Sequence, residues 1–368
     1  MKILFDNQIF SMQVYGGASK YFYELLKRIP ASDWDTTTHY SNNEYIRNQK
    51  LFHYLDFMPN QNFKGKAVLM DYLNRPNTLY RLKYGSYDVF HQTNYSTYYF
   101  DAIKGKKMVT TFHDMNYTKY KECYTNTLTN NVYEKELLQK KSVERADKII
   151  AISHHTKKDL VDLWNINPEK IVVIHHGVDK NKIPNLNTSR IIPEPYILYV
   201  GERFGFKNFA RFVQAFALIN EKFRDIKLIC TGRGFSDLEK NQIESLHIRD
   251  KIVQISANER TMAQLYRDAQ MFVYPTYSEG FGMPILEAMV YDCPVVVSNV
   301  SCLPEVAGDA CLYFDPFQVE DMALKMEQLL TSPTLRQEIV VKGAAQLEKF
   351  SWDKSAKEHI AVYQSLIK

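Results

Sequence analysis

The sequence lacks any long apolar run and any recognisable export signal. No stretch approaches the roughly 18 consecutive apolar residues that a membrane-spanning helix needs. The chain passes from Met1 straight into the strand-like segment KILF, without the hydrophobic region of a signal peptide. We therefore expect a protein that stays in the cytoplasm.

Cysteine is scarce, and its spacing argues against two kinds of structural site. The five cysteines form no C-x-x-C pair and are odd in number, which disfavours a disulfide framework and a zinc ribbon. They are Cys123, Cys230, Cys293, Cys302 and Cys311. A chain of 368 residues with 45% hydrophobic content instead suits a globular protein with two cores.

Two ligand-binding signatures are also missing. No G-x-G-x-x-G follows the first strand, where the chain has Gly16 and Gly17 after a long loop, so a dinucleotide oxidoreductase is disfavoured. The basic residues are scattered, and no RNA-binding or helix-turn-helix pattern accompanies them. We therefore expect no nucleic-acid partner.

Acidic residues are under-represented in the first half of the chain. Residues 1–190 contain 27 Lys and Arg against 19 Asp and Glu, whereas residues 191–368 contain 19 against 23, so the halves carry +8 and −4. A basic half indicates an anionic partner, such as a transiently bound membrane surface or a phosphate-bearing acceptor, although a solvated basic face would explain the charge equally well. The candidate membrane contacts are Lys64, Lys66, Lys104, Lys106 and Lys107.

Short β-branched segments alternate with amphipathic segments throughout, which is the pattern of an α/β protein. The expected strands are 2–5, 36–41, 88–92, 107–112, 148–153 and 170–176, followed by 196–200, 226–231, 251–255, 271–275, 294–298 and 311–314. Expected helices include 17–28, 128–146 and 155–164. Because the strands are almost continuously apolar, they should form parallel sheets buried on both faces.

The alternation breaks once, around residues 180–195, where three prolines occur without any periodicity. We therefore expect two doubly wound domains, one over residues 1–185 and one over 186–350. Ligands of such domains bind beyond the carboxyl ends of the strands, so the site should lie between the two sheets at those ends.

The segment EGFGMPILE follows a short apolar strand and leads into a helix. Glu279 and Glu287 flank a Gly-x-Gly turn whose bare backbone can approach a ligand closely. Pro284 suits the first position of the helix, whose N-terminal amides can face an anion. Taken alone, the segment could also be an ordinary strand–loop–helix connection.

A second loop, YVGERFGFKN, follows the strand that opens the same half. Gly201 ends the strand, Arg203 and Lys207 supply two cations, and Asn208 is placed to cap the next helix. Such a loop can neutralise a diphosphate, although Arg and Lys in loops are often only solvated.

The first half contributes two weaker signals at strand ends. Gly16 and Gly17 open a helix soon after the first strand, and His113 and Asp114 end a later one. A tight turn and a packed histidine are the simple explanations. Their shared position at strand ends is what suggests a role in binding.

These segments together resemble glycosyltransferase family 4, over nearly the whole chain. The strongest match is the E-x7-E motif from Glu279 to Glu287. Around it, in the order typical of the family, stand YGGASKYFYEL, TFHD, AISHHTKKDL, IHHGVD, VGERFGFKN, TGRG and LPEVAGDACLYFDP. The resemblance implies the GT-B fold of two Rossmann-like domains. The segment FSWDKSA resembles the family's ending, which implies that residues 351–368 form a helix packing back on the first domain.

The resemblance implies a retaining transfer of a sugar from a nucleotide-diphosphate donor to an acceptor hydroxyl, in which the departing phosphate accepts the acceptor's proton. Charge develops on the diphosphate, so its stabilisation is the main catalytic demand. By residue-wise match, Arg203 and Lys207 supply the cations, and Gly17, beside Gly16, brings a backbone N–H to the phosphate or sugar.

The same match assigns the other site residues. Glu279 holds the donor sugar beside the backbone amides of Phe281, Gly282 and Met283. Glu287 binds the ribose hydroxyls. His113 contacts the transferred sugar on the acceptor side.

We expect no metal and no other cofactor. Asp33 and Asp35 form a D-x-D of the kind that binds a metal–diphosphate in another glycosyltransferase fold, but they lie far along the chain from the phosphate loops. The pairs His154–His155 and His175–His176 consist of adjacent residues, which point to opposite faces of a strand and share an ion poorly.

Donor and acceptor are the least specified parts of the prediction. The opening segment is similar to bacterial mannosyltransferase-like members, which favours GDP-mannose and a saccharide acceptor, free or lipid-linked, in cell-surface polysaccharide assembly at the inner face of the plasma membrane. UDP-hexoses stay open. Residues 42–99, rich in Tyr, Phe and Asn, are expected to shape the acceptor site. Alternatives are a nucleotide-sugar 2-epimerase of the same fold and a catalytically silent sugar-binding protein.

Overall fold

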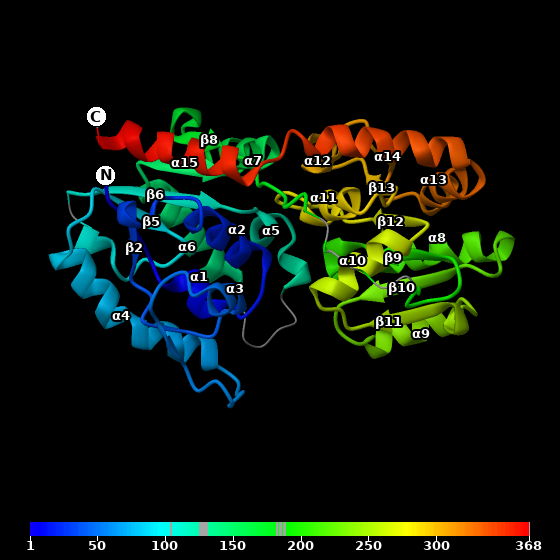
Figure 1. Cartoon of the computed structure of the whole chain (residues 1–368), viewed down its shortest axis with the longest axis horizontal. Coiled ribbons are helices and arrows are strands. Elements are labelled where there is room, and N and C mark those ends of the chain that lie inside the picture. Colours follow the sequence, from blue (N-terminus) through cyan, green and yellow to red (C-terminus); the bar gives the residue numbers. More distant parts are fainter. Residues whose placement is uncertain (104, 125–131, 182, 184–185, 187–188, 368) are drawn as a thin grey trace. The chain divides into compact units, whose positions relative to one another are not determined.

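The computed structural model describes residues 1–103, 105–124, 132–181, 183, 186 and 189–367. The chain divides into two compact units, each described here by itself (Figure 1). Unit 1 comprises 1–177 and 351–368, and unit 2 comprises 178–350. The first division falls earlier than the expected boundary at 185, while the second coincides with the expected start of the final helix.

Unit 1 is built on a six-stranded sheet with the order β2-β1-β5-β6-β7-β8. All its neighbouring strands are parallel, and they are almost entirely buried, as the apolar segments predicted. The strands are β1 (Ile3–Phe5), β2 (Trp34–Thr36), β5 (Val89–Gln92), β6 (Lys107–Phe112), β7 (Lys148–Ala151) and β8 (Ile171–Val173). The chain places β2 on one side of β1 and then β5 to β8 on the other side, so the switch point of this sheet lies between β1 and β5.

The expected second strand at 36–41 is wrong in detail. The sheet instead uses β2 (Trp34–Thr36), and the chain then leaves it. Residues Tyr40–Ser41 form β3, which pairs with β4 (Leu55–Asp56) in a separate two-stranded sheet. Asn74 explains the departure, because its side-chain oxygen accepts from the amides of both His39 and Tyr40, each at 2.8 Å.

The helices of unit 1 connect these strands and cover the sheet. They are α1 (Gln8–Met12), α2 (Gly17–Leu26), α3 (Glu44–Gln49), α4 (Lys66–Tyr84), α5 (Asn116–Lys119), α6 (Val132–Arg145), α7 (His154–Trp164) and α15 (Trp352–Ile367), with short 3-10 turns η1 (Ala31–Asp33), η2 (Phe100–Ile103), η3 (Lys121–Cys123) and η4 (Pro168–Lys170). The beginning of the expected helix 128–146 lies outside the described residues.

The last helix, α15, belongs to unit 1 although it follows unit 2 in the sequence (Figure 1). It packs against α2, β5 and β6. Gly177 is required where it begins, because a Cβ there would come within 2.0 Å of the Trp352 backbone nitrogen. The backbone of Gly177, where the first part of unit 1 ends, therefore lies directly against the backbone at the start of α15.

Unit 2 contains a second six-stranded sheet, with the order β11-β10-β9-β12-β13-β14 and only parallel neighbours. Its strands are β9 (Tyr196–Tyr199), β10 (Lys227–Thr231), β11 (Ile252–Ile255), β12 (Met271–Tyr274), β13 (Val295–Ser298) and β14 (Leu312–Phe314). The chain builds outward from β9 in one direction and from β12 in the other. The switch point of this sheet, where ligands of doubly wound folds bind, is therefore between β9 and β12.

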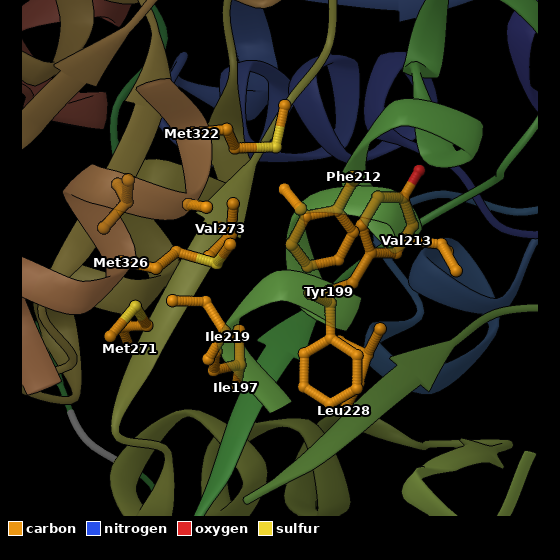
Figure 2. Close-up of a cluster of buried hydrophobic side chains, with 14 of the residues drawn as sticks. Ile197, Tyr199, Phe212, Val213, Ile219, Leu228, Met271, Val273, Met322 and Met326 are labelled. Atoms are coloured by element: carbon orange, nitrogen blue, oxygen red, sulfur yellow. The ribbon is translucent and has the colours of Figure 1, made fainter. Parts of the chain in front are cut away.

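Helices cover both faces of this second sheet, and Figure 2 shows the core on one face. They are η5 (Gly205–Lys207), α8 (Phe209–Lys222), α9 (Asp237–Ser245), η6 (Arg249–Lys251), α10 (Glu259–Asp268), α11 (Met283–Val290), α12 (Leu303–Ala307), α13 (Val319–Thr331) and α14 (Pro333–Leu347). Tyr199 of β9 stacks on Phe212 of α8, and Met322 and Met326 of α13 close the cluster (Figure 2). Within the described part of the chain, no helix combines the length and apolar character needed to cross a bilayer.

Candidate active site

Two predicted site residues meet at the switch point of unit 2. Lys207 lies in the loop after β9, and Glu279 lies in the loop after β12. The ammonium nitrogen of Lys207 lies 2.6 Å from Oε1 of Glu279, and both side chains are largely buried. A charge-assisted hydrogen bond therefore links the two loops that flank the expected ligand position.

Backbone contacts fix the relative position of these loops. Tyr277 donates its amide proton to the carbonyl oxygen of Phe206 at 2.7 Å, and the Thr276 hydroxyl donates to the same oxygen at 3.1 Å. Asn208 donates from Nδ2 to the carbonyl oxygens of Pro275 and Pro316, at 3.0 and 2.8 Å. Pro275, Thr276 and Tyr277 follow β12 and Pro316 follows β14, so the loop after β9 is held by residues that the sequence places far away.

Asn208 differs from its expected role in one respect. It does occupy the position before α8, but it has a left-handed backbone with φ of 57° and makes no side-chain cap. Its amide group instead holds the loops just described. The helix start is therefore fixed by tertiary contacts rather than by a local cap.

The backbone of Glu279 is held from the turn that precedes α12. Its amide donates to Oγ of Ser301 at 3.2 Å, and the Ser301 hydroxyl donates to its carbonyl oxygen at 2.8 Å. The Cys302 thiol donates to the same carbonyl at 3.2 Å. Tyr274 lies beside the carboxylate, and burial, followed by the charge of Glu279, raises the pKa of its hydroxyl well above the usual value. Tyr274 therefore stays protonated next to Glu279.

The Gly-x-Gly turn leads into α11 as predicted, with one difference in position. Gly282 has φ of 96°, and a Cβ there would lie 3.0 Å from the Leu303 side chain, so both backbone and space require glycine. The helix begins at Met283, so Pro284 occupies its second position rather than its first. Phe281 is buried and packs edge-on against Phe350, with ring centroids 5.7 Å apart.

Glu287 lies in the second turn of α11 and is partly buried. The hydroxyl of buried Tyr266 donates to its Oε2 at 3.4 Å. Burial, followed by the charge of Glu287, raises the pKa of Tyr266 well above its usual value, so this tyrosine remains a hydrogen-bond donor. A residue of α10 thus orients the Glu287 side chain.

Arg203, predicted to act with Lys207 on the diphosphate, is bound within the protein. Its side chain has 0% exposure, and its Nε donates to Oε1 of Glu239 at 2.9 Å. Its Nη groups donate to the carbonyl oxygens of Thr231, Arg233 and Gly234. The guanidinium therefore binds the loop after β10.

Two glycines bring the loops after β9 and β10 into direct contact. Gly201 has φ of 113°. Gly232 has φ of 97°, and a Cβ there would lie 2.9 Å from the carbonyl oxygen of Gly201. Any side chain at Gly232 would therefore separate the two loops.

Gly16 and Gly17 lie at the start of α2 in unit 1. A Cβ on Gly16 would come within 2.6 Å of Oε1 of Gln13, which accepts from the amide of Ser19 at 3.0 Å. A Cβ on exposed Gly17, by contrast, would meet nothing within 4 Å. Packing within the protein therefore explains Gly16 but leaves Gly17 without a structural requirement for its missing side chain.

His113 directly follows β6. Its amide donates to the Tyr95 hydroxyl at 3.2 Å, and its ring lies edge-on to Tyr21, with centroids 5.6 Å apart. Burial lowers the pKa of His113 to about 4, so its imidazole is neutral near pH 7. Its Nε2 is buried and has no hydrogen-bond partner among the described residues. A neutral ring with one unused nitrogen suits a substrate hydroxyl.

The histidine pairs and the D-x-D have other partners. His154 contacts His175 edge-on, with ring centroids 5.8 Å apart, whereas His176 packs against Tyr21 and Trp352. The members of an adjacent pair thus face different surroundings. Asp35 lies within β2 and forms an ion pair with Arg81 of α4.

Sequence reasoning missed the residues that position the predicted ones. Tyr266 orients Glu287, Ser301 and Tyr274 surround Glu279, and Glu239 binds Arg203. Only Glu239 carried a signal, since it follows Ser236 by three residues, which is the spacing of a capping box, and the structure contains that capping box. Oε2 of Glu239 accepts from the Ser236 amide in this capping box, and Oε1 accepts from Arg203.

Two family models match successive parts of the chain. The model described as Glycosyltransferase Family 4 matches residues 15–182, and the one described as Glycosyl transferases group 1 matches residues 187–346. O-antigen chain mannosyltransferase B of Escherichia coli is 28% identical, with 100% of both chains covered. O-antigen chain mannosyltransferase RfbU of Salmonella typhimurium is 30% identical over 52% of this chain and 53% of its own.

Among solved structures, the Anabaena protein HepE in complex with UDP and glucose superimposes with a TM-score of 0.75. The two share 17% identity, and the match covers 99% of this chain and 100% of that one. This likeness shows the GT-B fold, and the family matches account for both units. The chain is therefore a glycosyltransferase of family 4 with the GT-B fold.

Proposed function

We propose that this glycosyltransferase transfers mannose, with retention of anomeric configuration, from a nucleotide-diphosphate donor to a hydroxyl of a bacterial cell-surface polysaccharide. The contact between Lys207 and Glu279 at the switch point carries the proposal. It places a cation and a carboxylate together where the anionic leaving group and the polar sugar of such a donor would lie side by side.

Lys207 takes the leaving-group role. Its ammonium group has three N–H donors, and one bond to Glu279 leaves the others for diphosphate oxygens. As the bond from the anomeric carbon to the phosphate oxygen breaks, negative charge grows on the diphosphate and its attraction to Lys207 increases. Arg203 supports this indirectly, by holding the loop after β10 against the Lys207 loop.

Glu279 binds the donor sugar, beside the backbone of Phe281, Gly282 and Met283. Glu287 accepts hydrogen bonds from the ribose hydroxyls. In unit 1, the unused Nε2 of His113 accepts from a hydroxyl of the transferred sugar. The acceptor oxygen bonds to the anomeric carbon on the face that the phosphate leaves, and its proton passes to the departing phosphate.

The names of the relatives support mannose and polysaccharide assembly. The relative matched over both full lengths is described as an O-antigen chain mannosyltransferase. We further propose that the acceptor is lipid-linked and that the enzyme binds transiently to the anionic inner face of the plasma membrane. The +8 charge of residues 1–190 supports this location.

A donor panel tests the proposal. Purified protein is incubated with GDP-mannose, UDP-glucose and dTDP-glucose, with and without a polysaccharide primer, and products are followed by NMR. Primer-dependent α-mannoside from GDP-mannose is expected. Conversion of a donor sugar without primer would instead identify a 2-epimerase, and donor binding without turnover would identify a silent sugar-binding protein.

A further inference from the structure

Helix α4 buries several polar side chains and exposes large apolar ones. Asp71, Asn74 and Thr78 are buried on the inner side, beside Met70 and Leu82. The outer side exposes large apolar residues at intervals of three and four positions. These are Val68, Leu69, Tyr72, Leu73, Leu79, Tyr80 and Tyr84. Soluble helices show the opposite arrangement, so this outer face, here called the α4 apolar face, needs an explanation.

The inward polar face is a built structure and not a packing accident. Asn7 donates from Nδ2 to Asp71 at 3.0 Å and accepts from the Thr78 hydroxyl at 2.9 Å. Asn74 donates to the Ser11 hydroxyl at 2.9 Å, besides holding the chain around Tyr40. These bonds fix the rotation of α4 about its axis. The apolar side is therefore held outward.

The segment before α4 extends the same surface. Met58 and Phe63 are exposed, and Lys66 donates from Nζ to the carbonyl oxygens of Met58 and Gln61, at 2.8 and 2.7 Å. Figure 1 shows this segment as a loop at one end of α4, on the periphery of unit 1. The apolar area therefore continues beyond the helix.

The exposed charge on the outer side of α4 is basic. The only acid within α4, Asp71, is buried and pairs with Arg75 at 3.2 Å. Lys83 is exposed on the apolar side, with its nitrogen 5.1 Å from the Tyr84 ring, and Lys66 begins the helix at its other end. An apolar stripe with tyrosines and flanking cations is typical of a helix lying in the interface of an anionic membrane.

We propose that the α4 apolar face docks unit 1 on an anionic phospholipid surface. The proposal deepens the proposed function, since a lipid-linked acceptor would be found there. A second copy of the chain fits less well, because an antiparallel two-fold contact through α4 would bring the basic ends of the helices together, with Lys83 of one copy towards Lys66 of the other. The lysine cluster expected from the sequence is engaged elsewhere. Lys106 bonds the Tyr87 carbonyl, Lys107 pairs with Asp147, and Lys104 lies outside the described residues.

Matched double variants distinguish binding through the α4 apolar face from nonspecific binding by any exposed apolar side chain. Tyr72→Ser/Leu73→Ser changes residues that are 62% and 41% exposed on α4, and Tyr133→Ser/Leu137→Ser changes residues that are 65% and 50% exposed on α6. Both tyrosines contact a cation, with Arg75 5.5 Å and Lys121 5.2 Å from the respective ring. All four side chains are well exposed, so neither variant should disturb a core.

The test is co-sedimentation with vesicles of phosphatidylcholine, with and without phosphatidylglycerol. Wild type and the α6 variant should bind the anionic vesicles, and the α4 variant should bind at least about tenfold more weakly, since affinity follows the apolar area inserted. Lys83→Glu should weaken binding to anionic vesicles only. Equal binding by all variants, or no binding by wild type, would overturn the proposal.

Two controls distinguish other outcomes. Sedimentation velocity in the absence of vesicles should give the same state for wild type and the α4 variant; a dimer lost only in that variant would show that a second copy covers the face. Mannosyl transfer to a water-soluble primer is measured in parallel for wild type. Absence of transfer in wild type, with vesicle binding retained, would reject the proposed function and leave the membrane-docking role of α4 intact.

Discussion

The Nε of Arg203 donates to Oε1 of Glu239 at 2.9 Å, while Oε2 of the same carboxylate accepts from the amide of Ser236 at 2.6 Å. One glutamate thus caps α9 and binds the buried guanidinium that holds the loop after β10. This relationship divides the two cations of the VGERFGFK loop. We therefore expect Arg203 to stabilise the site and Lys207 to act on the donor.

The two cations should therefore respond differently to replacement. Arg203→Ala leaves Glu239 without its buried partner and should lower the free energy of unfolding by about 3–5 kcal/mol. Lys207→Ala should destabilise the protein less, because Lys207 is 20% exposed and gives up one bond, whereas Arg203 is 0% exposed and gives up four, but it should lower turnover by about 10²–10³-fold. Denaturant unfolding and initial rates check both. If the Arg203→Ala protein has normal stability but greatly reduced turnover, Arg203 acts directly on the donor.

The two glutamates of the motif should have separable effects. Glu287→Gln should weaken binding of free nucleotide as well as donor, by about 1–3 kcal/mol for a lost charged hydrogen bond. Glu279→Gln should leave nucleotide affinity nearly intact and reduce turnover. Titration calorimetry distinguishes them, with Tyr266→Phe as a control that disturbs only the orientation of Glu287. Equal nucleotide affinity in wild type and Glu287→Gln would refute the ribose assignment.

Activity should not require a divalent metal, because Lys207 provides the positive charge at the leaving group. Transfer rates measured in excess EDTA should match those without it. The same assay with added Mg²⁺ serves as the control. Full loss in EDTA that Mg²⁺ restores would contradict this account.

Gly17→Ala tests whether α2 begins at a ligand. A methyl group there meets nothing in the protein, and alanine favours a helix by about 1 kcal/mol over glycine, so stability should be kept or raised. If the Gly17 backbone approaches the donor, turnover should nevertheless fall. Gly105→Ala, on a loop of unit 1 with equally open space but φ of 76°, controls for general glycine replacement. Unchanged turnover in Gly17→Ala would remove Gly17 from the site.

The doubly wound architecture could be predicted because every strand of a parallel sheet is a compact apolar segment, and eleven of the twelve main-sheet strands overlap the expected ranges closely. The exception is the strand at Trp34–Thr36, where the expected range 36–41 shares only one residue. Its neighbours are polar threonines, and side chains of distant α4, chiefly Asn74 and Asn77, decide where the chain leaves the sheet. Local sequence contains no trace of those partners.

The motif residues Lys207 and Glu279 could be found for a similar reason, since both follow strands that flank the switch point. The role of Arg203 could not, because it depends on Glu239 and on carbonyl oxygens after β10. Likewise, the pattern of α4 does not reveal which side faces inward. Only the buried bonds of Asp71 and Asn74 show that its apolar side is exposed.

Acid should destabilise unit 1 because it buries four neutral histidines. Burial lowers the pKa of His113 and His359 to about 4 and that of His91 and His176 well below 6.5. Between pH 6.5 and 4 the unfolded chain binds protons at these rings and the folded chain does not, so stability falls as the pH falls. Each histidine should contribute a loss of about 2 kcal/mol at pH 5.

Asp6 opposes this trend. Burial raises its pKa to about 7, against partially compensating hydrogen bonds from Thr93 and Tyr99, so the folded chain keeps a proton that the unfolded chain loses above its usual value near 3.8. Stability from this group is therefore lost as the pH rises from 3.8 to 7. Between pH 7 and pH 5 the contribution of Asp6 offsets that of about one histidine. The free energy of unfolding should therefore still be lower at pH 5 than at pH 7.

The variant Asp6→Asn separates the two contributions. An asparagine carries no charge in either state, so at pH 8 the variant should unfold at a higher temperature than wild type, and its melting temperature should fall more steeply between pH 7 and pH 5. Thermal unfolding followed by circular dichroism at half-unit pH intervals measures both slopes. Parallel curves for wild type and Asp6→Asn would show that Asp6 titrates normally in the folded protein and that the histidines alone set the acid response.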